Sequence, residues 1–188
     1  MDTPRPHPIP ASAPAPGRVR LFVMDVDGTL TDGTITYAED GSEWKSFHAR
    51  DGMGVHLLSL AGIVPAIVTG RSSAIVLRRA QELGIEDVVQ GSRDKAAAVR
   101  TLRERLGFSA AAVAYIGDDL SDLPALREAG FSAAPSDAAD EVVRAVHFVC
   151  TRPGGRGAVR EAVEALLRRE GVWDTVLGRL ETVPGASR

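Results

Sequence analysis

The chain has 188 residues, of which 44% are hydrophobic and 25% charged, and its formal net charge is −3. This length suits one compact domain with a sizeable core, and the negative charge argues against nucleic-acid or anionic-membrane partners. Cys150 is the single cysteine, which excludes an intrachain disulfide and is typical of a reducing cytoplasm. No apolar run approaches the roughly 18 residues of a membrane span, and the N-terminus lacks the apolar centre of a signal peptide. We therefore expect a cytoplasmic protein.

Composition divides the chain into three parts. Residues 1–17 are rich in Pro and Ala and are expected to form a disordered arm, which carries His7 without an assigned role. Residues 18–170 are expected to form the folded domain. Residues 171–188 lose the periodic pattern and are expected to be a partly disordered extension, in which Trp173 and Val176 could still pack on the domain.

Apolar segments of strand and helix type alternate along the domain. An Asp-Gly turn at Asp40–Gly41 predicts a β-hairpin from residues 33–37 and 43–47. The alternation predicts an α/β fold with a doubly wound, mostly parallel sheet and ligands at the carboxyl ends of its strands. Strands are expected at 19–26, 64–69, 87–90, 113–116, 131–133 and 147–149, and helices at 51–60, 72–83, 92–106, from 121, at 138–145 and at 158–169.

Two acids stand at the end of the first apolar strand. Asp25 and Asp27 alternate along the chain, so both carboxylates can lean toward the same side. They repel each other unless a cation, a shared proton or a polar ligand intervenes. Alternatively, Asp25 and Asp27 are ordinary turn residues, and Gly28 supplies the unusual backbone angle of the turn. Further polar residues stand where later elements meet, namely Thr69, Lys95, and the acids Asp118, Asp119 and Asp122.

Four stretches resemble, in order, the four signatures of the haloacid dehalogenase (HAD) superfamily of phosphotransferases. They are Asp25-Val-Asp-Gly-Thr, Val68-Thr-Gly-Arg, the segment that ends in Lys95, and Gly117-Asp-Asp-Leu-Ser-Asp. The resemblance implies that Asp25 is the nucleophile and that Asp27 serves as general acid and then general base. Thr69 would hydrogen-bond a phosphate oxygen, and Lys95 would neutralise the phosphoryl group. Mg²⁺ would be held by the carboxylates of Asp25 and Asp118 and the backbone carbonyl of Asp27. Asp119 and Asp122 would support the site, with Asp122 either orienting Lys95 or capping its own helix.

The spacing of the motifs leaves no room for a separate cap domain. Thr69 lies 42 positions after Asp27, and Lys95 lies 26 positions after Thr69. The intervening residues are already used by the hairpin, helices and a short strand. Because phosphoenzyme hydrolysis benefits from a sheltered site, we expect a neighbouring subunit to cover it. The hairpin is the expected assembly surface of a homo-oligomer, with a tetramer as the leading hypothesis.

Residues 19–170 resemble more closely the capless 3-deoxy-D-manno-octulosonate 8-phosphate phosphatase family. The shared stretches are residues 25–33, 45–54, 69–71, 90–91, 115–119 and 154–161. This resemblance implies a tetramer that uses Mg²⁺ to hydrolyse a 2-keto-3-deoxy sugar acid phosphate. Residues 154–157 resemble a tail that in relatives reaches a neighbouring active site. The implied substrate-binding residues are Asp27, His48, Ala49, Arg50, Asp51, Gly52, His56, Gly70, Arg71, Arg79, Lys95 and Arg156.

Other interpretations stay open at this point. The closest rivals are phosphatases of nine-carbon keto-deoxy sugar acids and the phosphatase-like domain that accompanies some sialic-acid cytidylyltransferases. A noncatalytic scaffold subunit is a rival of another class, although a scaffold has no physical need for clustered acids. A phosphoacceptor receiver domain also uses an acidic pocket on a doubly wound sheet. The order of the motifs and the hairpin after the first of them disfavour it.

Overall fold

A computed structural model describes residues 19–182, so the predicted N-terminal arm and the last six residues lie outside the described part. Its centre is a parallel sheet of six strands with the order β5-β4-β1-β6-β7-β8. The strands are β1 (Leu21–Met24), β4 (Val64–Val68), β5 (Asp87–Val89), β6 (Val113–Ile116), β7 (Phe131–Ala134) and β8 (Phe148–Val149). The predicted α/β fold class is confirmed.

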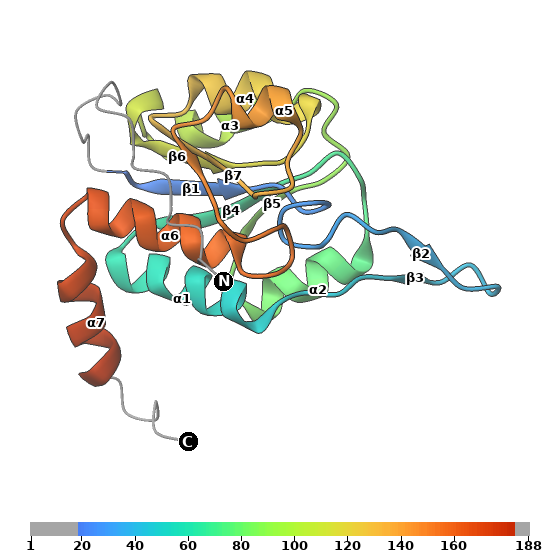
Figure 1. The fold of residues 1–188 in the computed structure, drawn as a ribbon, viewed down its shortest axis with the longest axis horizontal. Coiled ribbons are helices and arrows are strands. Elements are labelled where there is room, and N and C mark those ends of the chain that lie inside the picture. Colours follow the sequence, from blue (N-terminus) through green and yellow to red (C-terminus); the bar gives the residue numbers. More distant parts are fainter. Residues whose placement is uncertain (1–18, 183–188) are drawn as a thin grey trace, which may run out of the picture.

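Helices cover both faces of the sheet (Figure 1). One face carries α1 (Ala49–Ala61), α2 (Ala74–Glu82), α6 (Ala158–Arg169) and α7 (Trp173–Thr182), and the other carries α3 (Lys95–Arg105), α4 (Leu123–Glu128) and α5 (Asp140–Val143). Two short 3-10 helices, η1 (Ala110–Ala112) and η2 (Leu120–Asp122), complete the elements. Alternate residues of β1 divide between the two cores: Phe22 and Met24 face α1 and α6, and Leu21 and Val23 face the other layer.

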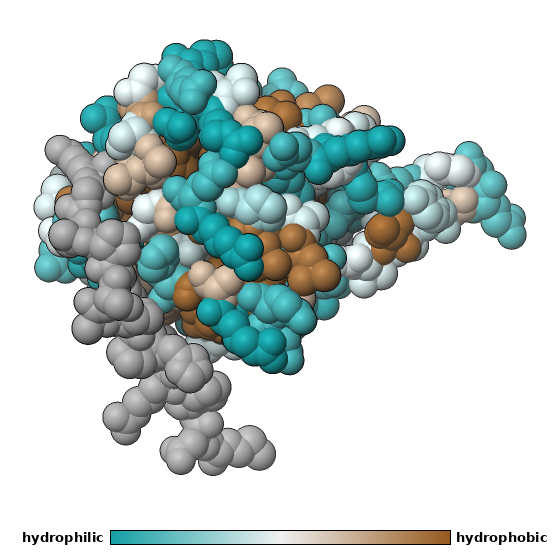
Figure 2. Space-filling view, turned by 90° about the horizontal axis from the view of Figure 1, so that it is seen from above, coloured by the Kyte–Doolittle hydropathy of each residue, from teal (hydrophilic) through white to brown (hydrophobic). Residues whose placement is uncertain are grey.

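The predicted hairpin is present but its strands are short. β2 (Thr36–Tyr37) pairs antiparallel with β3 (Glu43–Trp44), and Gly41 has a φ of 81° in the turn between them. The hairpin projects from the domain, and its surface mixes hydrophobic and polar side chains (Figures 1 and 2). Tyr37 and Trp44 are 63% and 67% exposed. Large exposed aromatic side chains of this kind are typical of a contact surface.

The start of α1 differs from the sequence prediction. Asp51 was expected near the N-cap, but the helix begins at Ala49, and His48 caps it by accepting the backbone N–H of Arg50. Asp51 is buried and accepts the backbone N–H groups of Gly157 (3.1 Å) and Arg160 (2.9 Å). Burial raises the pKa of Asp51 despite these hydrogen bonds. Its carboxylate therefore caps α6 rather than its own helix, a pairing that only tertiary packing creates.

The end of the described chain is also more regular than expected. Helix α7 forms where no periodic element was predicted, and it packs on α1 with Val176 buried. The Arg179 guanidinium donates to the backbone carbonyl of Leu60 at 2.6 Å, and Arg168 stacks over the Trp173 ring. None of the helices among residues 19–182 combines the length and apolar character that a membrane crossing requires.

Candidate active site

The predicted catalytic residues come together at one edge of the sheet. Asp25 follows β1, Thr69 follows β4, Asp118 follows β6, and Lys95 opens α3. β1 lies between β4 and β6, where the chain reverses its direction of winding, and ligands of doubly wound folds bind at such a point. A pocket of about 380 Å³ opens here, lined by Asp25, Asp27, Thr69, Gly70, Arg71, Ser92, Arg93, Lys95, Asp118, Asp119 and Ser121.

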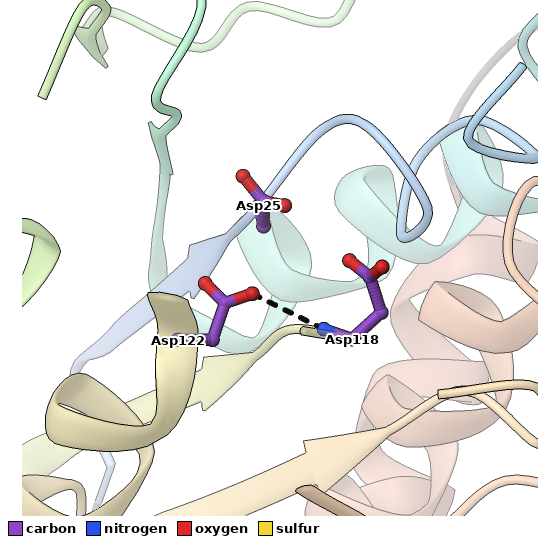
Figure 3. Close-up of side chains that lie close together, drawn as sticks. All are labelled: Asp25, Asp118 and Asp122. Carbon is purple, nitrogen blue, oxygen red and sulfur yellow. Dashed lines mark hydrogen bonds between the residues drawn. The ribbon is translucent and has the colours of Figure 1, made fainter. Parts of the chain in front are cut away.

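Three carboxylates lie close together here: Asp25 and Asp118 line the pocket, and Asp122 is fully buried beside them (Figure 3). Oxygen atoms of Asp25, Asp118 and Asp122 all lie within 4.8 Å of one another. Burial and the neighbouring Asp122 raise the pKa of Asp25 to about 6. Burial and the charges of Asp25 and Asp122 raise the pKa of Asp118 to about 7. The cluster therefore holds more negative charge than its own surroundings stabilise.

Asp122 differs from the other two acids because donors surround it. One of its oxygens accepts the Tyr115 hydroxyl (2.6 Å) and the Lys95 ammonium (2.7 Å). The other accepts the backbone N–H groups of Asp118 and Asp119, both at 3.3 Å, and the Asp119 side chain completes a capping box with it. Asp122 thus both contacts Lys95 and caps η2. Tyr115 was not singled out from the sequence, since a buried strand tyrosine looks like an ordinary core residue.

Lys95 joins the acids to the helix that carries it. Its ammonium lies 3.0 Å from Asp25 and 2.7 Å from Asp122, and its side chain is 6% exposed. Burial alone would lower the pKa of Lys95, but Asp25 and Asp122 outweigh it and raise the pKa above its ordinary value. Asp94 caps α3 by accepting the backbone N–H of Ala97, which fixes where the lysine leaves the helix. The lysine is held charged beside Asp25.

Asp27 sits in a different environment from Asp25. Its carboxylate pairs with the Lys45 ammonium, and the Arg71 Nε lies 3.7 Å from its second oxygen. Arg71 also donates to the Tyr37 hydroxyl (2.9 Å) and contacts Glu43 (3.0 Å). Asp25 and Asp27, at the end of the same strand, therefore have different partners. Two carboxyl groups need such different environments to act in different catalytic roles. Lys45 lies in the predicted hairpin and in the shared stretch 45–54 but had no role in the sequence prediction, because a lysine in a hairpin usually faces solvent.

The loop after β1 is shaped by close backbone contacts. Gly28 has a φ of 89°, and a Cβ there would lie 2.0 Å from Asp118 Oδ2. The Thr29 hydroxyl donates to Asp118 Oδ1 at 3.0 Å. Behind this loop, the backbone N–H of Gly155 donates to the Thr29 carbonyl at 3.0 Å. The glycine-rich segment before α6 therefore packs against the chain's own active-site loop, with Arg156 at 3.8 Å from Asp32.

Several residues that the resemblance assigns to the substrate lie outside the lining of this pocket. His48 caps α1, His56 is exposed on the same helix, and Arg79 pairs with Glu82. Arg50 lines a separate hollow of about 330 Å³ beside the N-terminus of α6, together with Arg152 and Arg160. The outlying residues are His48, Ala49, Arg50, Asp51, Gly52, His56, Arg79 and Arg156.

The acidic cluster fits a small hard cation. Asp25 and Asp118 offer carboxylate oxygens from two adjacent strands, and both have raised pKa values caused by burial and mutual repulsion. Mg²⁺ usually takes one or two carboxylates, with water and phosphate oxygens completing its coordination. Asp122 is the poorest candidate of the three because its oxygens already accept four hydrogen bonds.

This sheet, with a carboxylate at its switch point, a lysine at a helix start and a second acid on the next strand, defines a HAD-type hydrolase. The family model described as haloacid dehalogenase-like hydrolase matches residues 45–130. The 3-deoxy-D-manno-octulosonate 8-phosphate phosphatase of Haemophilus influenzae is 42% identical over 168 residues, covering 88% of this chain and 93% of the relative.

Solved structures agree with this similarity. The Moraxella catarrhalis phosphatase of the same name, in complex with magnesium, phosphate and KDO, has a TM-score of 0.83 and 44% identity, covering 86% of this chain and 93% of its own. The cobalt-bound Haemophilus influenzae phosphatase has a TM-score of 0.80 and 42% identity, covering 87% and 97%. The chain therefore belongs to the 3-deoxy-D-manno-octulosonate 8-phosphate phosphatase family of HAD-like hydrolases. The predicted family and enzyme class are confirmed.

Proposed function

We propose that this protein hydrolyses a 2-keto-3-deoxy sugar acid phosphate, 3-deoxy-D-manno-octulosonate 8-phosphate first of all, with Mg²⁺ as its cofactor. The observation that carries the proposal is the convergence of Asp25, Asp118 and Lys95 in one pocket, next to a separately held Asp27. Relatives of about 40% identity that carry this name support the substrate. The magnesium and phosphate in the Moraxella structure support the cofactor.

Each residue has a task in a two-step transfer. The Asp25 carboxylate attacks phosphorus, and the bond from phosphorus to the sugar oxygen breaks as Asp27 protonates the departing oxygen. Water then attacks the aspartyl-phosphate at phosphorus and gives a proton to Asp27. This step releases inorganic phosphate, frees the Asp25 carboxylate and returns Asp27 to its protonated form. Lys95 and Thr69 stabilise the negative charge on the phosphoryl oxygens. Mg²⁺, bound by Asp25 and Asp118, would supply further charge neutralisation.

We also propose that the protein works in the cytoplasm as a homo-oligomer, most simply a tetramer, in which a neighbour covers the pocket. Arg50 and His56 lie outside the lining of their own subunit's pocket, so they would contact a substrate that is bound in the pocket of a neighbouring subunit. The projecting hairpin, with Tyr37 and Trp44 exposed, offers the contact surface.

The test is phosphate release from a panel of sugar phosphates, measured with Mg²⁺ and with chelator. The panel includes the eight-carbon and nine-carbon keto-deoxy sugar acid phosphates and simple hexose phosphates. Strong Mg²⁺-dependent preference for the eight-carbon acid is expected. Preference for a nine-carbon acid would keep the mechanism and change the substrate. No release from any ester by a folded oligomer would overturn the enzymatic proposal in favour of a scaffold.

A further inference from the structure

Four charged side chains form a closed ring between the hairpin and the active site. Lys45 contacts Asp27 and lies 3.5 Å from Glu43, while Arg71 lies 3.0 Å from Glu43 and 3.7 Å from Asp27. Each cation thus bridges the same two carboxylates, and the ring has no net charge. Glu43 and Lys45 can share one side of the hairpin because side chains alternate along a strand.

Lys45 and Arg71 differ in what they can reach. The Lys45 side chain is 1% exposed and is absent from the pocket lining, whereas Arg71 is 41% exposed and lines the pocket. Lysine is almost never buried to this degree unless it is paired. Lys45 therefore lies behind Asp27, where it contacts the side chain of a catalytic residue but no substrate.

We propose that Lys45 is a positioning residue that holds the Asp27 carboxylate in place for proton transfer and ties it to the hairpin. The inference rests on the proposed phosphatase function and adds to it a residue without an assigned task. Removing Lys45 leaves Asp27 with Arg71 at 3.7 Å as its remaining cationic partner. Arg71 is also the more accessible partner, since its side chain is 41% exposed and lines the pocket that the substrate enters.

The hairpin gives this arrangement a further consequence. Lys45 follows directly after β3, and Glu43 lies within that strand. A displacement of the hairpin therefore moves the ammonium that holds Asp27. Misplacing a catalytic group by about 1 Å can cost about 100-fold in rate, so this connection is large enough to matter.

The decisive variant is Lys45→Met, which keeps the apolar stem and removes the ammonium. We expect kcat to fall by about 100-fold while KM for the sugar phosphate stays unchanged, because positioning acts on the transition state. Lys45→Arg should recover part of the lost kcat. In Lys45→Ala, added ethylammonium should restore turnover in a saturable manner. The control is Arg78→Met, which removes an exposed cation of α2 and should leave kcat and KM unchanged.

Three other outcomes would contradict the proposal that Lys45 positions Asp27. A raised KM with normal kcat would mean that Lys45 binds substrate, and normal kinetics in a folded Lys45→Met would mean that it has no role in turnover. If Lys45→Met fails to fold by circular dichroism, Lys45→Gln is measured instead. Failure of both to fold would make the ion pair purely structural. An inactive wild-type protein would count against the proposed phosphatase function, so the two failures are distinguishable.

Discussion

Carboxylate oxygens of Asp25, Asp118 and Asp122 lie within 4.8 Å of one another, and the different surroundings of these residues give them different chemistry. Asp122 is fully buried, but four donors satisfy it. Asp25 and Asp118 share Lys95 as the nearby cation, and their raised pKa values show that two ionised carboxylates are costly there. The pair is therefore prepared for a cation, whereas Asp122 serves to hold Lys95.

Replacing Asp25 by Asn should abolish turnover, because an amide cannot form the aspartyl-phosphate. The fold should survive, since the change removes one of several crowded negative charges. Phosphate release and thermal unfolding measure the two effects. Asp140→Asn, which changes an exposed aspartate of α5, is the control and should retain activity. Turnover that persists in Asp25→Asn would rule out the covalent mechanism.

Stabilisation by Mg²⁺ should depend strongly on pH. Carboxyls with folded pKa values of about 6 and 7, against 3.8 ordinarily, bind protons more tightly in the folded metal-free protein than in the unfolded chain. Metal-free stability therefore falls as pH rises from about 4 to about 7. A cation must displace these protons at low pH but meets free carboxylates at high pH.

At pH 8, Mg²⁺ at 100 times its Kd should stabilise the fold by about 2.7 kcal/mol. This corresponds to a rise in Tm of roughly 5–10 °C for a domain of this size. At pH 5.5 the rise should be much smaller. Differential scanning fluorimetry with Mg²⁺ and with chelator measures the rise in Tm. An equal rise at both pH values would show that Asp25 and Asp118, the carboxyls with raised pKa values, do not bind the ion.

At the scale of elements, the loop that lines the site after β1 is supported by a second loop far away in the sequence. The loop after β1 carries Asp27 and Gly28, and the segment before α6 packs directly behind it. α6 is in turn fixed by Asp51 of α1, whose buried carboxylate accepts two of its backbone N–H groups. Catalytic geometry therefore depends on the packing of α1, α6 and one loop.

Gly154→Ala tests this packing. An added Cβ would lie 1.8 Å from the carbonyl oxygen of Gly28, a backbone atom that cannot simply rotate away. We expect a loss of about 1–3 kcal/mol in unfolding free energy, as for other overpacked sites, together with reduced kcat. Gly178→Ala in α7, where a Cβ meets nothing within 4 Å, is the matched control. It should be neutral or slightly stabilising, because alanine favours helix. Denaturant unfolding compares the two, and equal stabilities would contradict the packing argument.

At the scale of the whole molecule, the outlying Arg50 and the projecting hairpin are the two observations behind the proposed homo-oligomer. Of the described residues, 19–182, none forms a separate cap domain over the pocket. Tyr37 and Trp44 are the most exposed large hydrophobic residues in this part of the chain. Covering them in an assembly would bury apolar area and bring a second chain near the site.

Trp44→Glu should therefore weaken the assembly and lower kcat/KM together. A charge placed in a buried contact costs free energy without a partner, so the dissociated form should gain population. Sedimentation velocity and steady-state kinetics measure the two effects on the same samples. Leu77→Glu changes a 52% exposed apolar residue of α2 and is the control for surface charge. An oligomer that Trp44→Glu leaves intact would show that the hairpin is not the contact.

Sequence alone determined the parallel α/β fold, the HAD family and the chain order of Asp25, Thr69, Lys95 and Asp118. These features are local, because an apolar strand followed by polar residues is visible within a few positions. Only the tertiary structure decided that Lys45 holds Asp27, that Tyr115 donates to Asp122, that Asp51 caps α6 and that α7 packs on α1. Those contacts join separate elements, and each depends on burial that packing creates, so no local pattern specifies them.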